Sequence, residues 1–383
     1  MIHVDIEVMT LTETRPATLP PTFTDEQLLS LAAEVGRVAA EYDEEHDRNA
    51  TFVTEAYEAA RANGYLRAAV PSDLGGGGAT MRQLVLAQHE LGKHSGAAAL
   101  SSTMHHYLTL VQVWRRARGA ADAEGVLAKI ADGLVMATSG GSDWVAPTTV
   151  ATEVEGGYLF TGRKVFCSQA PAASVISTCA VLGEPGSGAT VLHAGVPMAT
   201  EGVRIVETWD TLGMRGTASH DVVFEDVFVP AEKIAGTRPY GELSGPLLVA
   251  AMHFAPLVGA AYLGVAAGAC DKATERAKPG SERQVGEMRA RLRVALWGLL
   301  GAVAEVGDDM AADEATLETV MTAKRHAVNE ARAVVDIALE VAGGPAFFRG
   351  SPLERAYRDV RGGPFHPLTP EATLDLVGKR ALG

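Results

Sequence analysis

The spacing of apolar residues changes twice along the 383-residue chain, and this order constrains the fold more than any other feature. Helical spacing covers the first part, a period of two covers about residues 135–230, and helical spacing then returns. No strand–helix–strand unit occurs, which excludes a Rossmann nucleotide site. The sequence therefore predicts a multidomain α+β protein with a helical, a β and a second helical domain.

The predicted domain boundaries lie where the period changes. We expect an N-terminal tail at residues 1–22, an all-α domain at 23–133, an antiparallel β barrel or sandwich at 134–232 and a C-terminal four-helix bundle at 233–383. Strands are expected at 150–155, 158–166, 175–182, 189–196, 203–208 and 222–229. Helices are expected at 24–42, 54–63, 81–91, 98–118, 245–277, 282–307, 313–342 and 352–360, with a last one from about residue 371.

Charge and cysteine content narrow the class of protein. A net charge of −14 excludes nucleic acid as a partner and disfavours an anionic membrane. The three cysteines are scattered, which indicates a reducing cytoplasm. Residues 246–270 lack formal charge, but Pro256 and His253 interrupt them, so we expect a buried helix and no membrane span. The one dense basic cluster is interpreted as a solvated helix face and consists of Arg349, Arg355, Arg358 and Arg361.

Two groups of polar residues resemble known sites but lack the spacing. His105 and His106 are adjacent on a helix and point about 100° apart, so they cannot share a metal ion. We expect no metal, and one of the two histidines lining a substrate pocket. Consecutive residues of a strand point to opposite faces, so the run at residues 219–221 cannot form a nucleophilic triad.

One stretch, residues 136–169, combines two polar loops joined by a hairpin at residues 156–157. The first loop carries small hydroxyl and glycine residues at 138–143. The second closes on Phe166 and Ser168. Together they offer hydroxyls, amides and one aromatic face with almost no charge. This set suits a flat, polar-edged, redox-active ring better than a phosphate or a metal.

Three motifs in this order resemble the acyl-CoA dehydrogenase superfamily of flavoenzymes over essentially the whole chain. They are the loop Thr138 to Asp143, the segment Gly162 to Gln169, and Asp210 to Gly216 followed by Val223 to Pro230. The resemblance implies FAD as the cofactor. It also implies a homodimer or homotetramer that pairs through the C-terminal bundle.

The resemblance also assigns positions around the flavin. It implies that Phe166 packs on the flavin ring, that Ser168 bonds near flavin N5, and that Thr138 and Ser142 meet flavin and substrate. Further cofactor contacts are implied for Arg283, Gly343 and Gly344. The glutamine that the family carries before the paired glycines is Glu340 here. A carboxylate would repel a pyrophosphate, which leaves FMN open as the cofactor.

The catalytic base departs from the family pattern. The glutamate that removes the substrate α-proton is replaced by His366, within Phe-His-Pro, and the alternative position falls near His253, again without a carboxylate. Glu371 opens the next helix and is interpreted as a capping-turn acid. The Phe-His-Pro tail resembles the branch that includes reduced-flavin-dependent monooxygenases. An imidazole can act as acid or base in either mechanism.

Two enzymatic functions therefore stay open. The first is oxidation of a CH–CH bond of an acyl thioester, with hydride transfer to flavin N5 and an electron-transfer partner. The second is a monooxygenase that receives reduced flavin (FMNH2) from a reductase and acts through C4a-hydroperoxyflavin. The family base rate favours the first, and the missing glutamate favours the second. A third alternative, a relative that binds acyl groups without turnover, is disfavoured because Phe166 and Ser168 are retained.

Overall fold

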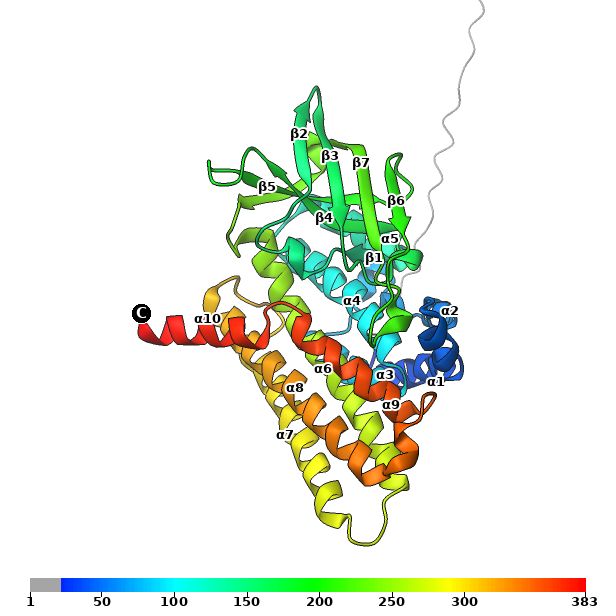
Figure 1. Cartoon of the computed structure of the whole chain (residues 1–383). Coiled ribbons are helices and arrows are strands. Elements are labelled where there is room, and N and C mark those ends of the chain that lie inside the picture. The colour runs from blue at the N-terminus through cyan, green and yellow to red at the C-terminus, as the bar shows by residue number, and fades with distance from the viewer. Residues whose placement is uncertain (1–21) are drawn as a thin grey trace, which may run out of the picture.

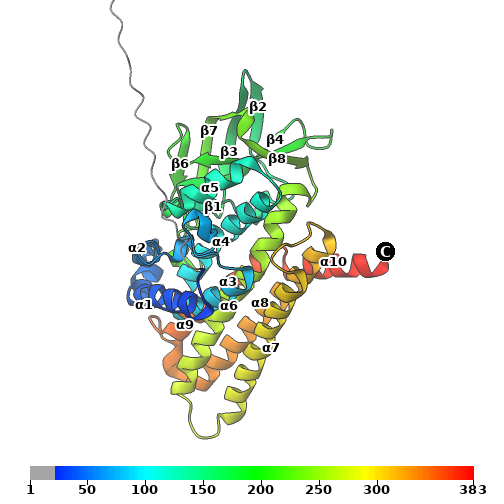
Figure 2. The ribbon, with the colours of Figure 1, turned by 180° about the vertical axis from the view of Figure 1, so that it is seen from behind.

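The computed structural model describes residues 22–383, apart from the side chain of Ser142, and has the expected order of helical, β and helical segments (Figure 1). The predicted tail at residues 1–22 lies outside the described residues, except for Thr22. The β segment lies at one end of the molecule and the long C-terminal helices extend from the other (Figures 1 and 2).

The N-terminal segment is helical and confirms the predicted helices. Thr24 caps the first helix, and the side chain of Gln27 returns to the Thr24 backbone, which forms the expected capping box. The short α5 was missed by sequence reasoning. The helices are α1 (Asp25–Asn49), α2 (Thr54–Ala62), α3 (Met81–His94), α4 (Gly96–Ala117) and α5 (Ala121–Ala131).

The middle segment is one curled sheet with the strand order β6-β7-β3-β2-β4-β5-β8. Most neighbouring strands are antiparallel, as predicted, but β4 pairs in parallel with β1 and β2. Two strands were missed, β1 and β8, and β8 extends the sheet beyond residue 232 because it pairs with β5. The strands are β1 (Met136–Thr138), β2 (Val150–Val154), β3 (Gly157–Lys164), β4 (Val175–Leu182), β5 (Thr190–Pro197), β6 (Val203–Val206), β7 (Asp221–Pro230) and β8 (Ile234–Pro239).

The C-terminal segment contains three long helices, with two shorter helices packed on α8. The long helices are α6 (Gly245–Glu275), α7 (Glu282–Val306) and α8 (Glu314–Ala342), and the shorter are α9 (Pro352–Asp359) and α10 (Pro370–Leu382). Among the described residues, α6 alone is long and apolar enough to cross a membrane, but 89% of its apolar window is buried inside the protein. It is therefore a core helix, as predicted.

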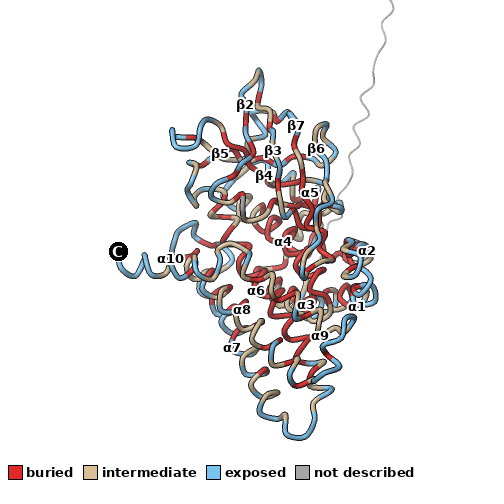
Figure 3. The backbone as a smooth tube through the Cα atoms, viewed as in Figure 1, coloured by how far each residue is buried: buried red, intermediate tan, exposed pale blue. Residues whose placement is uncertain are grey.

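Helix α6 also joins the two helical segments. A Cβ on Gly92 of α3 would lie 2.6 Å from the carbonyl oxygen of Ala261 on α6, so the two backbones approach more closely than a side chain allows. Buried residues concentrate along α3, α4 and α6 in the centre of the molecule (Figure 3). The N-terminal and C-terminal helices therefore share one core, and α6 provides a fixed wall beside the sheet.

Candidate active site

Phe166 follows β3 and presents its ring at the surface. It adopts a φ of +57° and is 54% exposed. The backbone N–H of Gly140 donates to the carbonyl of Val165 over 2.8 Å. A Cβ on Gly140 would lie 2.5 Å from the Cβ of Phe166, so glycine is needed at this position. The loop after β1 therefore lies against the aromatic ring, as the two motifs predicted.

The same loop reaches the C-terminal segment. A Cβ on Gly141 would lie 2.6 Å from the ring carbons of Pro367. Trp144, just after the loop, packs on Phe254 of α6 with ring centroids 5.6 Å apart. Phe254 in turn lies 5.8 Å from the ring of His366. The β-domain loop, helix α6 and the Phe-His-Pro segment thus meet at one aromatic site.

His366 is held by a tyrosine that sequence reasoning missed. Its Nε2 atom lies 2.9 Å from the hydroxyl of Tyr262 on α6. Burial, together with the charge of Lys324, lowers the pKa of His366 to about 3. Burial raises the pKa of Tyr262 well above its usual value, so the phenol keeps its proton. His366 is therefore a neutral imidazole whose ring is oriented by its bond to a neutral hydroxyl.

Lys324 of α8 fixes the backbone of this segment. Its Nζ donates to the carbonyls of residues 366, 367 and 368 over 2.7, 3.0 and 2.7 Å. Burial lowers the pKa of Lys324 to about 7. Three acceptors, however, need three N–H donors, which only the ammonium form supplies. We therefore assign Lys324 as charged at neutral pH, with its charge directed at backbone dipoles.

Two signals in the sequence could have revealed these residues. Tyr262 is the single tyrosine in the uncharged stretch 246–270, and a buried phenol needs a hydrogen-bond partner. Lys324 lies between Val320 and Val328 at i±4 spacing, so it interrupts the apolar face of its helix. A lysine at such a position is buried, and a buried ammonium needs acceptors.

The two predicted hydroxyls each have a hydrogen-bond partner in the protein. Ser168 is 7% exposed, and its Oγ lies 2.8 Å from the Oγ of Ser219. Thr138 ends β1 and bonds to the hydroxyl of Tyr107. The side chain of Ser142 lies outside the described part of the structure, so its predicted contact with flavin and substrate stays a prediction.

Neither predicted substrate histidine offers a free nitrogen to a surface site. Nδ1 of His105 accepts from the N–H of Met136 (3.1 Å), and its Nε2–H donates to the carbonyl of Leu66 (2.7 Å). Both rings are fully buried, and that of His106 packs on Tyr65 with centroids 4.9 Å apart. Burial lowers the pKa of His105 to about 4 and that of His106 well below its usual value. Both are core residues, which corrects the expectation that one lines the substrate pocket.

His253 is also a core residue. Its Nδ1 lies 2.8 Å from the carbonyl of Val249, one turn earlier on α6, and burial lowers its pKa to about 4. The next residue, Phe254, points to His366 instead. The predicted catalytic position on α6 is therefore occupied by an apolar ring, because a one-residue step rotates the side chain by about 100°.

The other predicted cofactor residues lie at the far end of the bundle. Gln284, next to Arg283, donates to Glu340 of α8 over 3.4 Å, which places the start of α7 beside the end of α8. Gly343 lies about 28 Å from Lys324 along α8, at the helical rise of about 1.5 Å per residue. Lys324 contacts residue 367, which packs on Gly141 beside Phe166, so Arg283, Gly343 and Gly344 at the other end of α8 do not reach Phe166 of the same chain.

A buried ion pair fixes the first loop to the sheet. The Oδ2 of Asp143 lies 3.0 Å from the Nζ of Lys164, and the two side chains are 7% and 0% exposed. The same ammonium donates to the carbonyl of Cys179 over 2.6 Å. Lys164 ends β3 two residues before Phe166, so the pair ties the loop to the strand that carries the ring.

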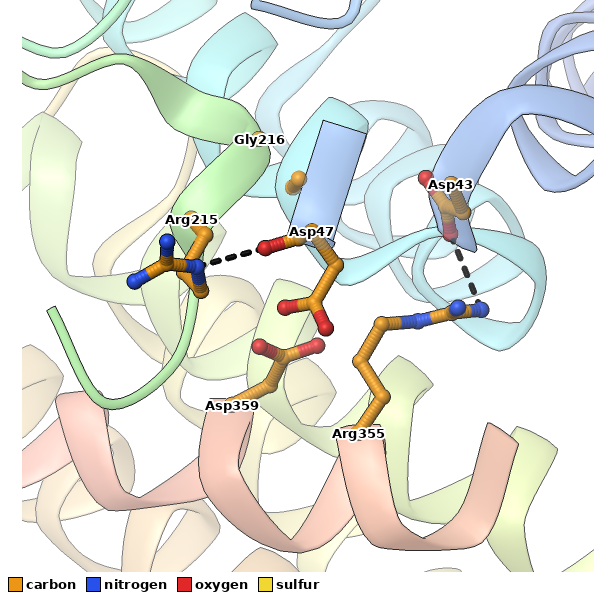
Figure 4. Close-up of a pocket in the computed structure, with 7 residues that line it drawn as sticks. Asp43, Asp47, Arg215, Gly216, Arg355 and Asp359 are labelled. Carbon is orange, nitrogen blue, oxygen red and sulfur yellow. Dashed lines mark hydrogen bonds and ion pairs between the residues drawn. The ribbon is translucent and has the colours of Figure 1, made fainter. Parts of the chain in front are cut away.

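Two hollows between α1 and α9 are lined by paired charges and lie apart from the aromatic site. The smaller, of about 10 Å³, is lined by Asp43 and Asp47 of α1, by Arg355 and Asp359 of α9, and by Arg215 (Figure 4). The larger encloses about 150 Å³. Three of the four clustered arginines pair with carboxylates, but their side chains are only 16%, 11% and 21% exposed, so the cluster forms largely buried ion pairs and no solvated helix face. These pairs are Arg355 with Asp43, Arg358 with Asp47 and Arg361 with Asp336.

Comparison with known families decides what this arrangement belongs to. Models of the N-terminal, middle and C-terminal domains of acyl-CoA dehydrogenase match residues 25–133, 137–227 and 256–370. The chain belongs to the acyl-CoA dehydrogenase superfamily. It is therefore a flavin-dependent oxidoreductase, and the resemblance of the three motifs is confirmed.

Full-length relatives within this superfamily differ in activity. An amino sugar nitrososynthase of Streptomyces rubradiris is 31% identical over 94% of this chain and 90% of its own. A putative acyl-CoA dehydrogenase of Bacillus subtilis (strain 168) is 28% identical over 91% of this chain and 95% of its own. The structure of KijD3 in complex with FMN and dTDP-3-amino-2,3,6-trideoxy-4-keto-3-methyl-D-glucose is 27% identical, with a TM-score of 0.82 over 95% of this chain and 96% of that chain.

The residues of the aromatic site fit an isoalloxazine ring. Phe166 offers an exposed face, and Trp209 supports it edge-on with ring centroids 5.8 Å apart. The polar groups beside it are neutral hydroxyls and backbone amides. A flavin needs such a stacked face and neutral partners, because the cofactor itself carries the redox chemistry.

Proposed function

We propose that the chain is a monooxygenase that uses reduced flavin, the second of the two activities that the sequence leaves open. The observation that carries the proposal is the state of His366. It occupies the place of the dehydrogenase glutamate, and burial together with the charge of Lys324 lowers its pKa, which makes it a weaker base for removing the α-proton of a thioester. In the described part of the chain, no carboxylate bonds to His366 or Tyr262.

The residues of the site have separate roles in this proposal. When bound, reduced flavin supplies the electrons that activate O2. Phe166 stacks on the ring, and Ser168 contacts its edge. His366 lies beside the flavin as a neutral imidazole, and the bond between its Nε2 atom and the Tyr262 hydroxyl orients the ring. Trp144 and Phe254 exclude water from one side of the site.

We propose a primary amine as the substrate class, on the strength of the nitrososynthase relatives. Oxygenation would convert the amine, O2 and reduced flavin into a hydroxylamine, water and oxidised flavin. The aromatic rings beside His366 suit an amine, since a ring face attracts a cation and tolerates the neutral form. The ammonium of Lys324 is directed at three backbone carbonyls, and that of Lys164 is paired with Asp143.

FMN is the flavin that the chain favours. Glu340 is exposed three residues before Gly343, where it would face the pyrophosphate of FAD. FMN has no pyrophosphate and avoids this repulsion. The FMN complex of KijD3, at 27% identity, supports the same choice.

The oligomer and partners follow from distance and chemistry. Arg283 and the paired glycines lie too far from Phe166 to contact the same flavin within one chain, so a role for them at the cofactor requires a second copy. We propose a homodimer or homotetramer, checked by light scattering of the purified protein. A cytoplasmic flavin reductase would supply the reduced cofactor.

Acyl-thioester oxidation is the second candidate, supported by the putative acyl-CoA dehydrogenase of Bacillus subtilis (strain 168). Two assays separate the candidates. In the first, a panel of acyl-CoA thioesters is added anaerobically to the flavin-loaded protein. In the second, an NADH-dependent flavin reductase supplies FMNH2 in air with a panel of primary amines, and hydroxylamine is measured.

The two assays give opposite results for the two functions. A monooxygenase forms hydroxylamine in step with NADH consumption, and no thioester bleaches the flavin. His366→Ala should lower turnover at least about tenfold and keep the flavin content. Bleaching by a thioester without hydroxylamine formation would replace the monooxygenase with the dehydrogenase.

A further inference from the structure

Three buried hydroxyl groups form an unbranched chain that ends on a backbone carbonyl. The Oγ of Ser168 lies 2.8 Å from that of Ser219, which lies 2.7 Å from the Oγ1 of Thr217. The Thr217 hydroxyl donates to the carbonyl of Met214 over 2.8 Å. The three side chains belong to residues that are 7%, 3% and 0% exposed, so water does not compete for their protons.

Backbone pairing between two motifs brings these hydroxyls together. The N–H of Cys167 donates to the carbonyl of His220 over 3.0 Å, and the N–H of Gln169 donates to the carbonyl of Thr217 over 3.0 Å. These two backbone hydrogen bonds pair residues 167–169, which follow Phe166, with residues 217–220, which precede β7. Ser168 lies opposite Ser219 as a result. The Ser219 hydroxyl is bonded to the hydroxyls of Ser168 and Thr217 and, as predicted, does not form a triad with its two sequence neighbours.

The carbonyl at the end sets the direction of every proton in the chain. A carbonyl oxygen can only accept, so Thr217 uses its single proton on Met214. Thr217 must then accept from Ser219, and Ser219 must accept from Ser168. The Ser168 proton is directed inward, and its free lone pair is the group that faces a ligand.

We propose that Ser219 and Thr217 are positioning residues that make Ser168 a hydrogen-bond acceptor, so that the site selects reduced over oxidised flavin. N5 of reduced flavin carries a hydrogen and can donate to Ser168, whereas N5 of oxidised flavin can only accept. The inference rests on the proposed function in placing flavin N5 at Ser168. It adds the redox state that the free cofactor must have to bind well.

The size of the preference follows from the hydrogen bond that would be lost if the protons of the three hydroxyls all pointed the other way. Reversal turns the Ser168 proton outward and removes the bond from the Thr217 hydroxyl to Met214. That carbonyl still accepts from the Nε1 of Trp209 (3.0 Å) and from the Thr217 N–H (3.1 Å). One neutral hydrogen bond is therefore lost, which corresponds to about a fivefold preference for reduced flavin.

The test compares affinities for the two redox states of FMN. The dissociation constant of oxidised FMN is measured in air by fluorescence quenching, and that of dithionite-reduced FMN anaerobically by ultrafiltration. Thr217→Val removes the terminal donor. The dissociation constant of oxidised FMN divided by that of reduced FMN should therefore fall about fivefold. At about 29.6 mV per tenfold for two electrons, the midpoint potential of bound FMN should fall about 20 mV.

Three further variants make the result specific. Ser219→Ala removes the acceptor for the Ser168 proton and should lower the ratio at least as much; it also serves if Thr217→Val fails to fold. Thr217→Ser keeps the hydroxyl and should keep the ratio. Ser102→Ala removes a buried hydroxyl of α4 that donates to the carbonyl of Ala98 (2.8 Å), away from the chain, and should also leave the ratio unchanged.

The outcomes separate this inference from the proposed function. If wild type binds both forms but Thr217→Val and Ser219→Ala weaken both affinities equally, the hydroxyls have a structural role and the inference is wrong. A wild type that prefers oxidised FMN overturns it as well. If wild type binds neither form, the proposed flavin site itself is wrong, and the inference is wrong with it.

Discussion

The hydroxyl of Tyr262 and the Nε2 atom of His366 lie 2.9 Å apart, although 104 residues separate them in the sequence. Tyr262 is fully buried in the central helix, and His366 lies on the irregular segment before α10. The bond therefore attaches the irregular segment before α10 to the buried central helix α6. It also fixes the orientation of the imidazole ring.

Tyr262→Phe should lower turnover about tenfold or more, because His366 loses the bond that orients its ring. The free energy of unfolding should fall by about 1 to 3 kcal/mol, since a buried ring nitrogen is left without its partner. Steady-state kinetics and urea unfolding measure the two effects. Tyr65→Phe is the matched control, because the buried Tyr65 hydroxyl bonds to Gln88 over 2.7 Å. It should lose stability and retain turnover; equal loss of turnover in both variants would contradict the role of Tyr262.

Lys324→Met should destabilise the segment that carries His366. Three carbonyls lose a charge-assisted donor, and the free energy of unfolding should fall by about 3 kcal/mol or more. Below its melting temperature the variant should still bind flavin but turn over at least about tenfold more slowly. Limited proteolysis should cut it near residues 366–370 faster than wild type. Lys379→Met, on the exposed end of α10, should change neither the free energy of unfolding nor turnover. Unchanged turnover in Lys324→Met would show that Lys324 is not needed for the reaction.

The order of helices and strands could be predicted because it depends on local periodicity. The capping box at Thr24 and the apolar run of α6 each determine their own element. Strands β1 and β8 could not be predicted in this way. β1 has only three residues, and the pairing of β1 with β4 and of β8 with β5 is a long-range contact that no local pattern encodes.

The site was predictable only where motifs carry it. The positions of Phe166 and Ser168 follow from one of the three motifs and that of His366 from the Phe-His-Pro tail, and the structure brings the loop beside Phe166 against Pro367. The direction of a helical side chain is a different matter. At His253 one residue of rotation decides between the core and the site, and this rotation depends on how α6 packs on its neighbours.

The ion pair between Asp143 and Lys164 allows a double-variant test of the first loop. Lys164→Met leaves the Asp143 carboxylate buried and unpaired, which should cost about 3 to 5 kcal/mol of unfolding free energy. Asp143→Leu should cost a similar amount, because it leaves the Lys164 ammonium buried without its carboxylate partner. The double variant, Asp143→Leu with Lys164→Met, should recover most of this loss. Urea midpoints of all four proteins measure it, and strictly additive losses would show that the two charges do not stabilise one another.

His253 provides a pH test that separates a core histidine from a catalytic one. Its pKa is lowered from 6.5 to about 4 by burial, so the unfolded chain binds a proton that the folded protein does not bind between these values. The stability that neutral His253 provides is therefore present above pH 6.5 and is lost as the pH falls. Between pH 7 and pH 5 the loss is about 2 kcal/mol for this one group.

His253→Gln can keep a bond to the Val249 carbonyl but cannot titrate, so it isolates this contribution. Relative to wild type, the variant should gain about 2 kcal/mol of unfolding free energy when the pH is lowered from 7 to 5. Urea unfolding at both pH values measures the difference, in which the other titrating groups cancel. Turnover should stay within about twofold of wild type, because Phe254 and not His253 faces His366. A tenfold loss of turnover at unchanged stability would return His253 to the catalytic machinery.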